Sequence, residues 1–315
     1  LVVAARAGGE ERTVQSRVVP VARKNPYQQL ISCGQGLWYN TSKGSAPTME
    51  FQGKVWQRVQ TAADTAWTAY VNWPSGRPID PSVPPRPLAN AFVDAHRPGT
   101  PAPTHYDLST PAFIKFDTAS PNPVFYCSPQ PSNSGSFPEQ NWYEFYTDED
   151  MALKIQGTVV WVVGQGACFR KTVNVQALVP NDPNNPNVLV IVAKPNLHET
   201  GPGADPNRAL WFKGGLELSD PAAVKVFLVS EGDISLTQYG NRFTNFDAKA
   251  LSIVAGGSVE LMGPESGNVF KLSYVSVMDA IANQLLASGA LPPTSGGSGK
   301  SFVYAWHSWL ETRLP

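Results

Sequence analysis

Charged side chains are scarce in this chain, since Asp, Glu, Lys and Arg make up only 16% of its 315 residues. An average soluble domain has about a quarter. The net charge is −1, which argues against a chain that seeks polyanions through its overall charge. Ser, Thr, Asn and Gln must cover the surface instead. Such surfaces are common in β-proteins that are secreted or that bury much of their area against other copies.

Cysteine is also rare, and Cys33, Cys127 and Cys168 form an odd set without C-x-x-C spacing. This pattern argues against a disulfide framework and a structural zinc site, and favours buried thiols in a reducing setting. No run of about 18 apolar residues is present, so we expect no membrane span. The start, LVVAARAGG, is too short and too soon interrupted for a signal peptide. We therefore expect a trimmed or processed product.

Proline and glycine are plentiful, with 29 and 26 residues, and they separate many short apolar runs that have β-branched or alternating patterns. More than eight such runs with turn signals between them predict an antiparallel sandwich or barrel. The predicted strands are Thr13–Val21, Glu50–Val59, Ala66–Trp73, Ala112–Phe116, Val124–Tyr126, Trp142–Tyr146, Ala152–Val163, Lys171–Leu178, Val188–Val192, Leu210–Leu218, Ala223–Val229, Ala250–Val254 and Val269–Val275.

One helix is predicted near the end of the chain, where Ser276 can cap it and Gly289 can stop it. Val277, Ile281 and Leu285 would share its buried face. The run from Thr61 to Thr65 fits either a short helical turn or a strand extension. Residues 74–111 are Pro-rich and weakly patterned, and we find no internal repeat of fixed period.

Two sequence motifs resemble catalytic or nucleotide-binding loops, but each lacks what its chemistry needs. The stretch FDTAS at 116–120 has Ala119 where the aspartic-protease turn needs glycine, and no second D-[TS]-G exists. The stretch TSGGSGKS at 294–301 lacks the first glycine of a P-loop, and Pro-Pro precedes it instead of a strand. No nucleophile elbow is present. We therefore predict that the chain is not an enzyme.

Three further groups of side chains are candidates for binding. His96 and His105 flank a Pro-rich loop with Asp94 and Asp107, which fits either a metal site or exposed loop side chains. Glu144, Asp148 and Asp150 belong to the densest acidic cluster, which could bind Ca²⁺ or simply form a solvated turn. Nine tryptophans are spread along the chain, as a sugar-binding platform or as core and interface packing.

The first 24 residues are locally basic, with five cations against Glu10 and Glu11, a net +3 that leaves −4 for the remainder. Such an arm could contact phosphates or an acidic surface, or it could be a solvated tail. Its cations are Arg6, Arg12, Arg17, Arg23 and Lys24.

Taken together, the basic arm, the low-charge β-region rich in Pro and Asn, the late helix and the aromatic C-terminal tail resemble the coat protein of a small icosahedral positive-strand RNA virus. That resemblance implies an all-β antiparallel jelly-roll sandwich with long loops and one short helix. It implies an arm over residues 1–30, a shell domain over 31–232, and a C-terminal segment over 233–315 that could project. Many copies would close into a capsid in the host cytoplasm and become a virion.

The same resemblance assigns roles to the candidate residues and partners. The five arm cations would bind viral RNA, and Glu144, Asp148 and Asp150 would hold Ca²⁺ at a contact between copies. A host receptor would remain to be identified. The alternative is a secreted β-sandwich that binds or hydrolyses polysaccharide, supported by the tryptophans and the low charge. Light scattering separates the two, because a capsid protein forms large closed particles.

Overall fold

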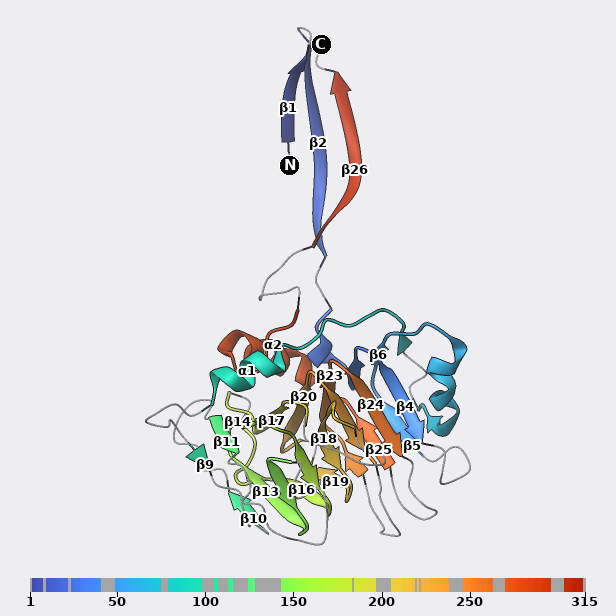
Figure 1. The fold of residues 1–315 in the computed structure, drawn as a ribbon. Helices are drawn as coiled ribbons and strands as arrows, with labels where there is room; N and C mark the ends of the chain where they lie inside the picture. Colours follow the sequence, from blue (N-terminus) through green and yellow to red (C-terminus); the bar gives the residue numbers. More distant parts are fainter. Residues whose placement is uncertain are drawn as a thin grey trace. The chain divides into compact units, whose positions relative to one another are not determined.

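The computed structural model describes residues 2–7, 10–21, 24–40, 49–74, 79–97, 105–106, 113–115, 124–127, 143–182, 184–196, 205–218, 220, 222–237, 246–262, 270–295 and 303–313. The chain forms two compact units (Figure 1). One unit joins residues 1–25 to residues 297–315, and the other spans residues 26–296.

The first unit is a three-stranded antiparallel sheet in the order β1-β2-β26. Its strands are β1 (Val2–Ala7), β2 (Glu10–Val21) and β26 (Val303–Arg313). Three arm cations lie within it, with Arg6 opposite Glu11 and Arg12 opposite Arg313, while Arg17 lies in β2. Lys24 follows β2 and is exposed, and Arg23 lies outside the described residues. RNA binding by these residues stays a prediction.

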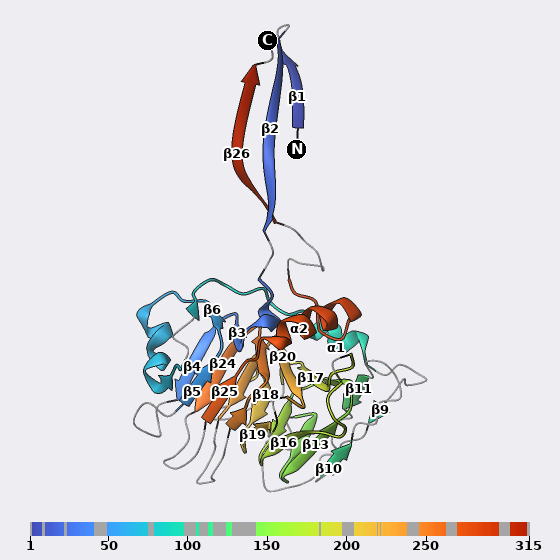
Figure 2. The same cartoon turned by 180° about the vertical axis from the view of Figure 1, so that it is seen from behind.

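The second unit contains three sheets in which every described strand pairing is parallel (Figures 1 and 2). The expected antiparallel jelly roll is therefore wrong. From β12 to β25, successive strands visit the six-, eight- and nine-stranded sheets in turn, and each strand pairs with the strand of the same sheet in the preceding circuit. This arrangement is a three-sided solenoid of parallel strands, whose stacked circuits we call rungs.

The nine-stranded sheet has the order β8-β6-β3-β23-β20-β17-β14-β11-β9. Its core strands are continuous apolar runs because both faces are buried, as parallel sheets require. The strands are β8 (Ile79–Asp80), β6 (Val55–Gln57), β3 (Ile31–Cys33), β23 (Leu251–Ala255), β20 (Lys225–Ser230), β17 (Val188–Ala193), β14 (Thr158–Val163), β11 (Val124–Cys127) and β9 (His105–Tyr106).

The six-stranded sheet has the order β12-β15-β18-β21-β24-β4, and the eight-stranded sheet has the order β10-β13-β16-β19-β22-β25-β5-β7. The six strands are β12 (Phe145–Thr147), β15 (Ala167–Phe169), β18 (Arg208–Phe212), β21 (Asp233–Leu236), β24 (Ser258–Met262) and β4 (Gly36–Asn40). The eight are β10 (Phe113–Lys115), β13 (Met151–Ile155), β16 (Val173–Ala177), β19 (Leu216–Leu218), β22 (Phe246–Ala248), β25 (Phe270–Ser273), β5 (Met49–Gln52) and β7 (Val71–Asn72).

Inward-facing side chains of the three sheets form one apolar core, because residues at equal register stack from rung to rung. Trp161 is fully buried in this core. The centroid of its ring lies 5.0 Å from that of Phe145 and 6.0 Å from that of Phe169. Phe169 in turn stacks on Phe212 at 4.6 Å. One stacked row runs through Trp161, Ile191, Leu228, Ile253, Ile31, Val55 and Ile79.

Two α-helices lie over the outer face of the nine-stranded sheet (Figures 1 and 2). The predicted late helix is α2 (Val277–Ser288), which ends at Gly289 in the left-handed region with φ 75°. Ile281 and Leu285 are buried as predicted, but Val277 is exposed and Met278 takes its place. The second helix, α1 (Ala89–Ala95), lies in the Pro-rich region, where no helix was predicted.

The open question at Thr61 resolves as a helical turn, because η2 (Ala62–Tyr70) is a 3₁₀ helix. The Asp64 carboxylate accepts hydrogen bonds of 2.7 Å from the backbone N–H groups of Gln60 and Thr61. These bonds satisfy donors at the helix start. Trp67 from η2 packs beside Phe51 and Trp73. Most of the predicted strand Ala66–Trp73 is therefore helix.

The chain enters the solenoid in its middle, not at an end. β3, the first strand of the unit, pairs with β23 on one side and β6 on the other. Strands β4 and β5 likewise pair with β24 and β25. The rungs formed by the first strands therefore continue the stack built by the last ones, although more than 100 residues of chain separate them along the sequence.

The segment after β8 runs along the outside of the stack. Its α1 packs on β17 and β20. Leu88 N–H donates to the Pro293 carbonyl at 2.8 Å, and Arg86 forms an ion pair of 2.9 Å with Glu231. The first residues of the unit contact the same C-terminal segment. In η1 (Pro26–Gln28), the Tyr27 hydroxyl donates to the Pro292 carbonyl at 2.8 Å.

The rungs from β21 to β25 stack in the same three sheets as the rungs before them. The described strands on both sides of residue 232, where the expected C-terminal segment begins, thus belong to one unit, and the expected division of the chain there stays a prediction. None of the described helices is long and apolar enough to cross a membrane.

Candidate functional site

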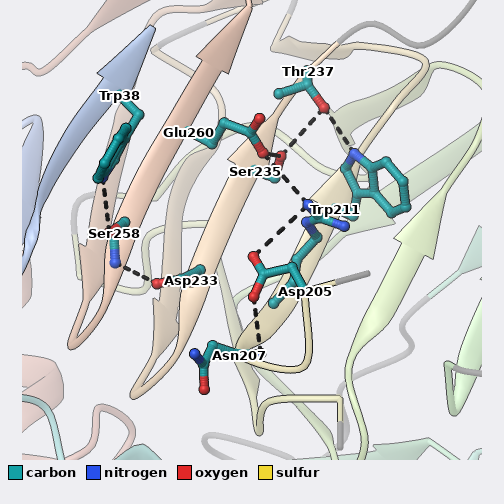
Figure 3. Close-up of polar contacts among 10 residues, drawn as sticks. Trp38, Asp205, Asn207, Trp211, Asp233, Ser235, Thr237, Ser258 and Glu260 are labelled. Carbon is teal, nitrogen blue, oxygen red and sulfur yellow. Dashed lines mark hydrogen bonds and ion pairs between the residues drawn. The ribbon is translucent and has the colours of Figure 1, made fainter. Parts of the chain in front are cut away.

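The outer face of the six-stranded sheet carries polar and aromatic side chains that are joined by hydrogen bonds and ion pairs (Figure 3). At one register position, strand after strand presents a side chain away from the core. This outer row consists of Tyr146, Cys168, Trp211, Ser235, Glu260 and Trp38. Neighbouring members lie about 4.8 Å apart along the solenoid, the usual strand spacing.

Glycine-containing corners bring the chain from the nine-stranded sheet into this face. A Cβ atom at Gly34 would overlap the Gly256 carbonyl of the rung below, and one at Gly256 would overlap the Glu231 carbonyl. Glycine is thus required where successive corners stack closely. The corners fix the start of each strand and hence which side chains join the outer row.

The β12 end of the row is buried and apolar. Tyr143, Tyr146, Cys168 and Trp211 form a small cluster of their own. The Trp211 indole N–H donates to the Thr237 hydroxyl at 2.8 Å. Trp211 is only 8% exposed. It therefore packs within this cluster and offers little ring area to a ligand.

Two cations are held against the ring of Trp211. The Arg208 guanidinium and the Lys213 ammonium each lie 4.2 Å from its centroid, within cation–π range. A β-bulge between Arg208 and Leu210 places two residues of β18 against one of β21. Bulges of this kind re-aim side chains.

Arg208 also links two carboxylates. Its guanidinium lies 3.6 Å from Glu260 and 3.7 Å from Asp205. Glu260 accepts a hydrogen bond of 2.7 Å from the Ser235 hydroxyl, and Asp205 accepts one of 3.0 Å from the backbone N–H of Asn207. The Glu260 and Asp205 side chains remain 33% and 29% exposed. They therefore keep acceptor oxygens available to a ligand.

Trp38 occupies the β4 end of the row and is 66% exposed, the most exposed large hydrophobic side chain among the described residues. Its indole N–H donates to the Ser258 hydroxyl at 3.2 Å, which orients the ring (Figure 3). The backbone N–H of Ser258 donates to Asp233. The arrangement is an oriented, water-exposed aromatic ring beside a network of carboxylates and hydroxyls.

Burial raises the pKa of Asp233, and the neighbouring Asp205 carboxyl adds to the effect, while the Ser258 N–H opposes it. A raised pKa means that the folded chain holds this proton more tightly than the unfolded chain. Between the ordinary Asp value of 3.8 and the raised value, unfolding therefore releases protons, and stability falls as pH rises.

We expect Asp233→Asn to remove this part of the pH dependence. The difference in unfolding free energy between variant and wild type should grow in the variant's favour as pH rises above about 4. Urea unfolding followed by circular dichroism across the acidic range measures it. Two stability curves that run parallel at all pH values would contradict the assignment.

The expected Ca²⁺ ligands do not converge. Glu144 is buried and accepts a hydrogen bond of 2.8 Å from the Gln165 N–H. Asp148 lies 3.5 Å from Arg170, and Asp150 accepts a bond of 3.1 Å from the Thr172 N–H. Each one therefore contacts the next rung. No group of three His, Cys, Asp or Glu side chains that could hold a metal occurs in the part of the chain that the structure describes. Ca²⁺ at a contact between copies stays a prediction.

The other sequence candidates are only partly described. Asp94 on α1 forms ion pairs with Lys194 and Arg97, and His96 Nδ1 lies 2.8 Å from the Phe92 carbonyl oxygen. His105 lies in β9. Asp107, the FDTAS stretch and most of the TSGGSGKS stretch fall outside the described residues. Strands flank FDTAS as predicted, but β10 and β11 belong to different sheets.

Sequence reasoning missed Asp205, Arg208, Ser258 and Glu260 altogether and counted Trp38 as one tryptophan among nine. A usable signal was present. The corners Cys33-Gly34-Gln35-Gly36-Leu37 and Val163-Gly164-Gln165-Gly166-Ala167 share the same G-Q-G core. Aligning them places Trp38 and Cys168 at one register position, which is where the structure has them.

Comparison of the chain with protein-family models, with curated proteins and with solved structures finds no match. Function is therefore argued from the geometry of this site alone.

Proposed function

We propose that this protein binds polysaccharide on the outer face of its six-stranded sheet. The observation that carries the proposal is Trp38, an exposed indole that donates a hydrogen bond to Ser258 and whose register partner on the neighbouring strand is Glu260. A flat aromatic ring that leaves one face open to water is suited to stack on the apolar face of a sugar ring. Carboxylates and hydroxyls next to it are suited to accept hydrogen bonds from sugar hydroxyls.

The geometry favours binding over cleavage. Hydrolysis of a glycosidic bond requires a carboxylic acid that can deliver a proton to the leaving oxygen. Glu260 and Asp205 are both already engaged in ion pairs with Arg208. Asp233, the carboxyl with the raised pKa, is partly exposed and accepts a hydrogen bond from the Ser258 backbone N–H. The prediction that the chain is not an enzyme is therefore retained.

The jelly roll was the structural basis for expecting a capsid subunit, and the parallel solenoid removes that basis. Assembly into a closed shell, packaging of RNA and location in a virion stay predictions that particle sizing would test. Polysaccharide binding was the alternative drawn from the sequence. The exposed Trp38 supports it, although on a solenoid and not on a β-sandwich.

Replacing Trp38 by alanine should weaken glycan binding by about 2 kcal/mol, or roughly thirtyfold, because the stacking surface is lost. Isothermal titration calorimetry against a panel of oligosaccharides measures the effect. Val277→Ala is the matched control, since Val277 is another exposed apolar side chain but lies on α2. Equal affinities for wild type and Trp38→Ala would rule out this face as the binding site.

A further inference from the structure

Resting on the proposed function, we propose that the Trp38 face selects uncharged glycans and discriminates against polyuronates. The charges that a ligand can reach decide this selectivity. Five charged side chains belong to the site. The carboxyl groups are those of Asp205, Asp233 and Glu260 (Figure 3). The two cations are Arg208 and Lys213.

The two cations are almost completely buried. The Arg208 side chain is 9% exposed and Lys213 is 3% exposed. Both lie over the Trp211 ring, and Arg208 is further engaged by two carboxylates. A uronate carboxylate in the ligand would need one of these cations, and reaching it would require an existing contact to break.

The carboxylates, by contrast, are the accessible charges. Glu260 and Asp205 each keep about a third of their side-chain surface exposed, and Glu260 is adjacent to Trp38 across β24 and β4. A polyuronate stacked on Trp38 would bring its own carboxylates against them, and like charges at such a contact disfavour binding. Sugar hydroxyls would instead donate to these oxygens through charge-assisted hydrogen bonds.

The experiment compares ligands of equal length. Cellohexaose, laminarihexaose, maltohexaose and N-acetylchitohexaose are the uncharged probes, hexagalacturonate is the anionic probe, and fully deacetylated chitohexaose is the cationic probe. We expect at least one uncharged probe to bind at least tenfold more tightly than hexagalacturonate. Its affinity should change less than twofold between 50 and 500 mM salt, because no ligand charge is screened.

Glu260→Gln supplies the second measurement. The amide keeps an acceptor for the Ser235 hydroxyl but removes the charge that repels uronate and engages Arg208. Hexagalacturonate should gain at least fivefold in affinity, while the uncharged ligand should change less than threefold. Glu217→Gln, on the eight-stranded sheet, is the matched control and should change neither.

Each outcome separates this inference from the proposed function. If hexagalacturonate or deacetylated chitohexaose binds most tightly and Trp38→Ala weakens that binding, the face binds glycans but the selectivity is refuted. If none of the six probes binds, or if Trp38→Ala has no effect, the proposed function itself fails. An unchanged hexagalacturonate affinity in Glu260→Gln would show that carboxylate repulsion does not set the selectivity.

Discussion

Replacing Trp161 by alanine is expected to lower the free energy of unfolding by about 3–5 kcal/mol, the usual cost of truncating a large buried aromatic. Trp161 is fully buried in the apolar core of the solenoid. The ring contacts of Phe145 and Phe169 would be lost together with the transfer energy of the indole. The short strands around it cannot collapse into the cavity without breaking their parallel register.

Trp38→Ala provides a chemically identical control at an exposed site. Substitutions at such surface positions usually change stability by less than about 0.5 kcal/mol. Both variants should be unfolded in urea and followed by far-ultraviolet circular dichroism, since tryptophan fluorescence is itself altered by the substitution. Similar losses in the two variants would refute the buried position of Trp161.

A cysteine at position 255 is expected to form a disulfide with Cys33. The structure pairs Cys33 directly with Ala255 in neighbouring parallel strands, and both side chains face the core. Their Cα atoms should lie about 4.8 Å apart, within the roughly 4.4–6.8 Å that a disulfide spans. Closing a loop of more than 200 residues stabilises the folded chain by up to about 5 kcal/mol, less any strain in the bond.

This experiment tests the entry of the chain into the middle of the solenoid, the least local feature of the fold. Because burial raises the pKa of the Cys33 thiol to about 12, the Ala255→Cys variant must be refolded in a redox buffer and not oxidised when folded. Non-reducing peptide mapping identifies the bond, and melting with and without reductant measures its effect.

Ala193→Cys is the matched control, because Ala193 lies three strands from Cys33 in the same sheet. That distance is about 14 Å, too far for a disulfide. A bond between position 193 and Cys33, or the failure of position 255 to pair with Cys33, would contradict the stacking of β3 on β23.

Strand positions were largely readable from the sequence, because many strands are short runs rich in apolar residues, with Gly, Pro or Asn in the turns between them. The predicted runs Val188–Val192 and Ala250–Val254 correspond to β17 and β23. The run Ala152–Val163, predicted as one strand, is two strands in different sheets that meet at Gly157. Its left-handed φ of 64° turns the corner. A glycine inside an apolar run was the available sign of that corner.

The direction of strand pairing could not be read from alternation, which is the same for parallel and antiparallel strands. A signal did exist in the composition, since runs such as Val188–Ala193 are apolar at every position. Runs of that kind are typical of parallel strands buried on both faces. No repeat of fixed period could be found in the sequence because the rungs differ in length. The spacing along the chain is uneven between the stacked positions Trp161, Ile191, Leu228 and Ile253.

By itself the sequence determined that this chain is mostly β, that α2 forms near its end, and that its surface carries few charges, because these features follow from local patterns and composition. Only the tertiary structure decided that the strands run parallel, that the first rungs stack on the last, and that Trp38 joins Glu260 and Arg208 on one face. Those residues lie far apart in the chain. They meet only because stacked rungs bring equal register positions about 4.8 Å apart.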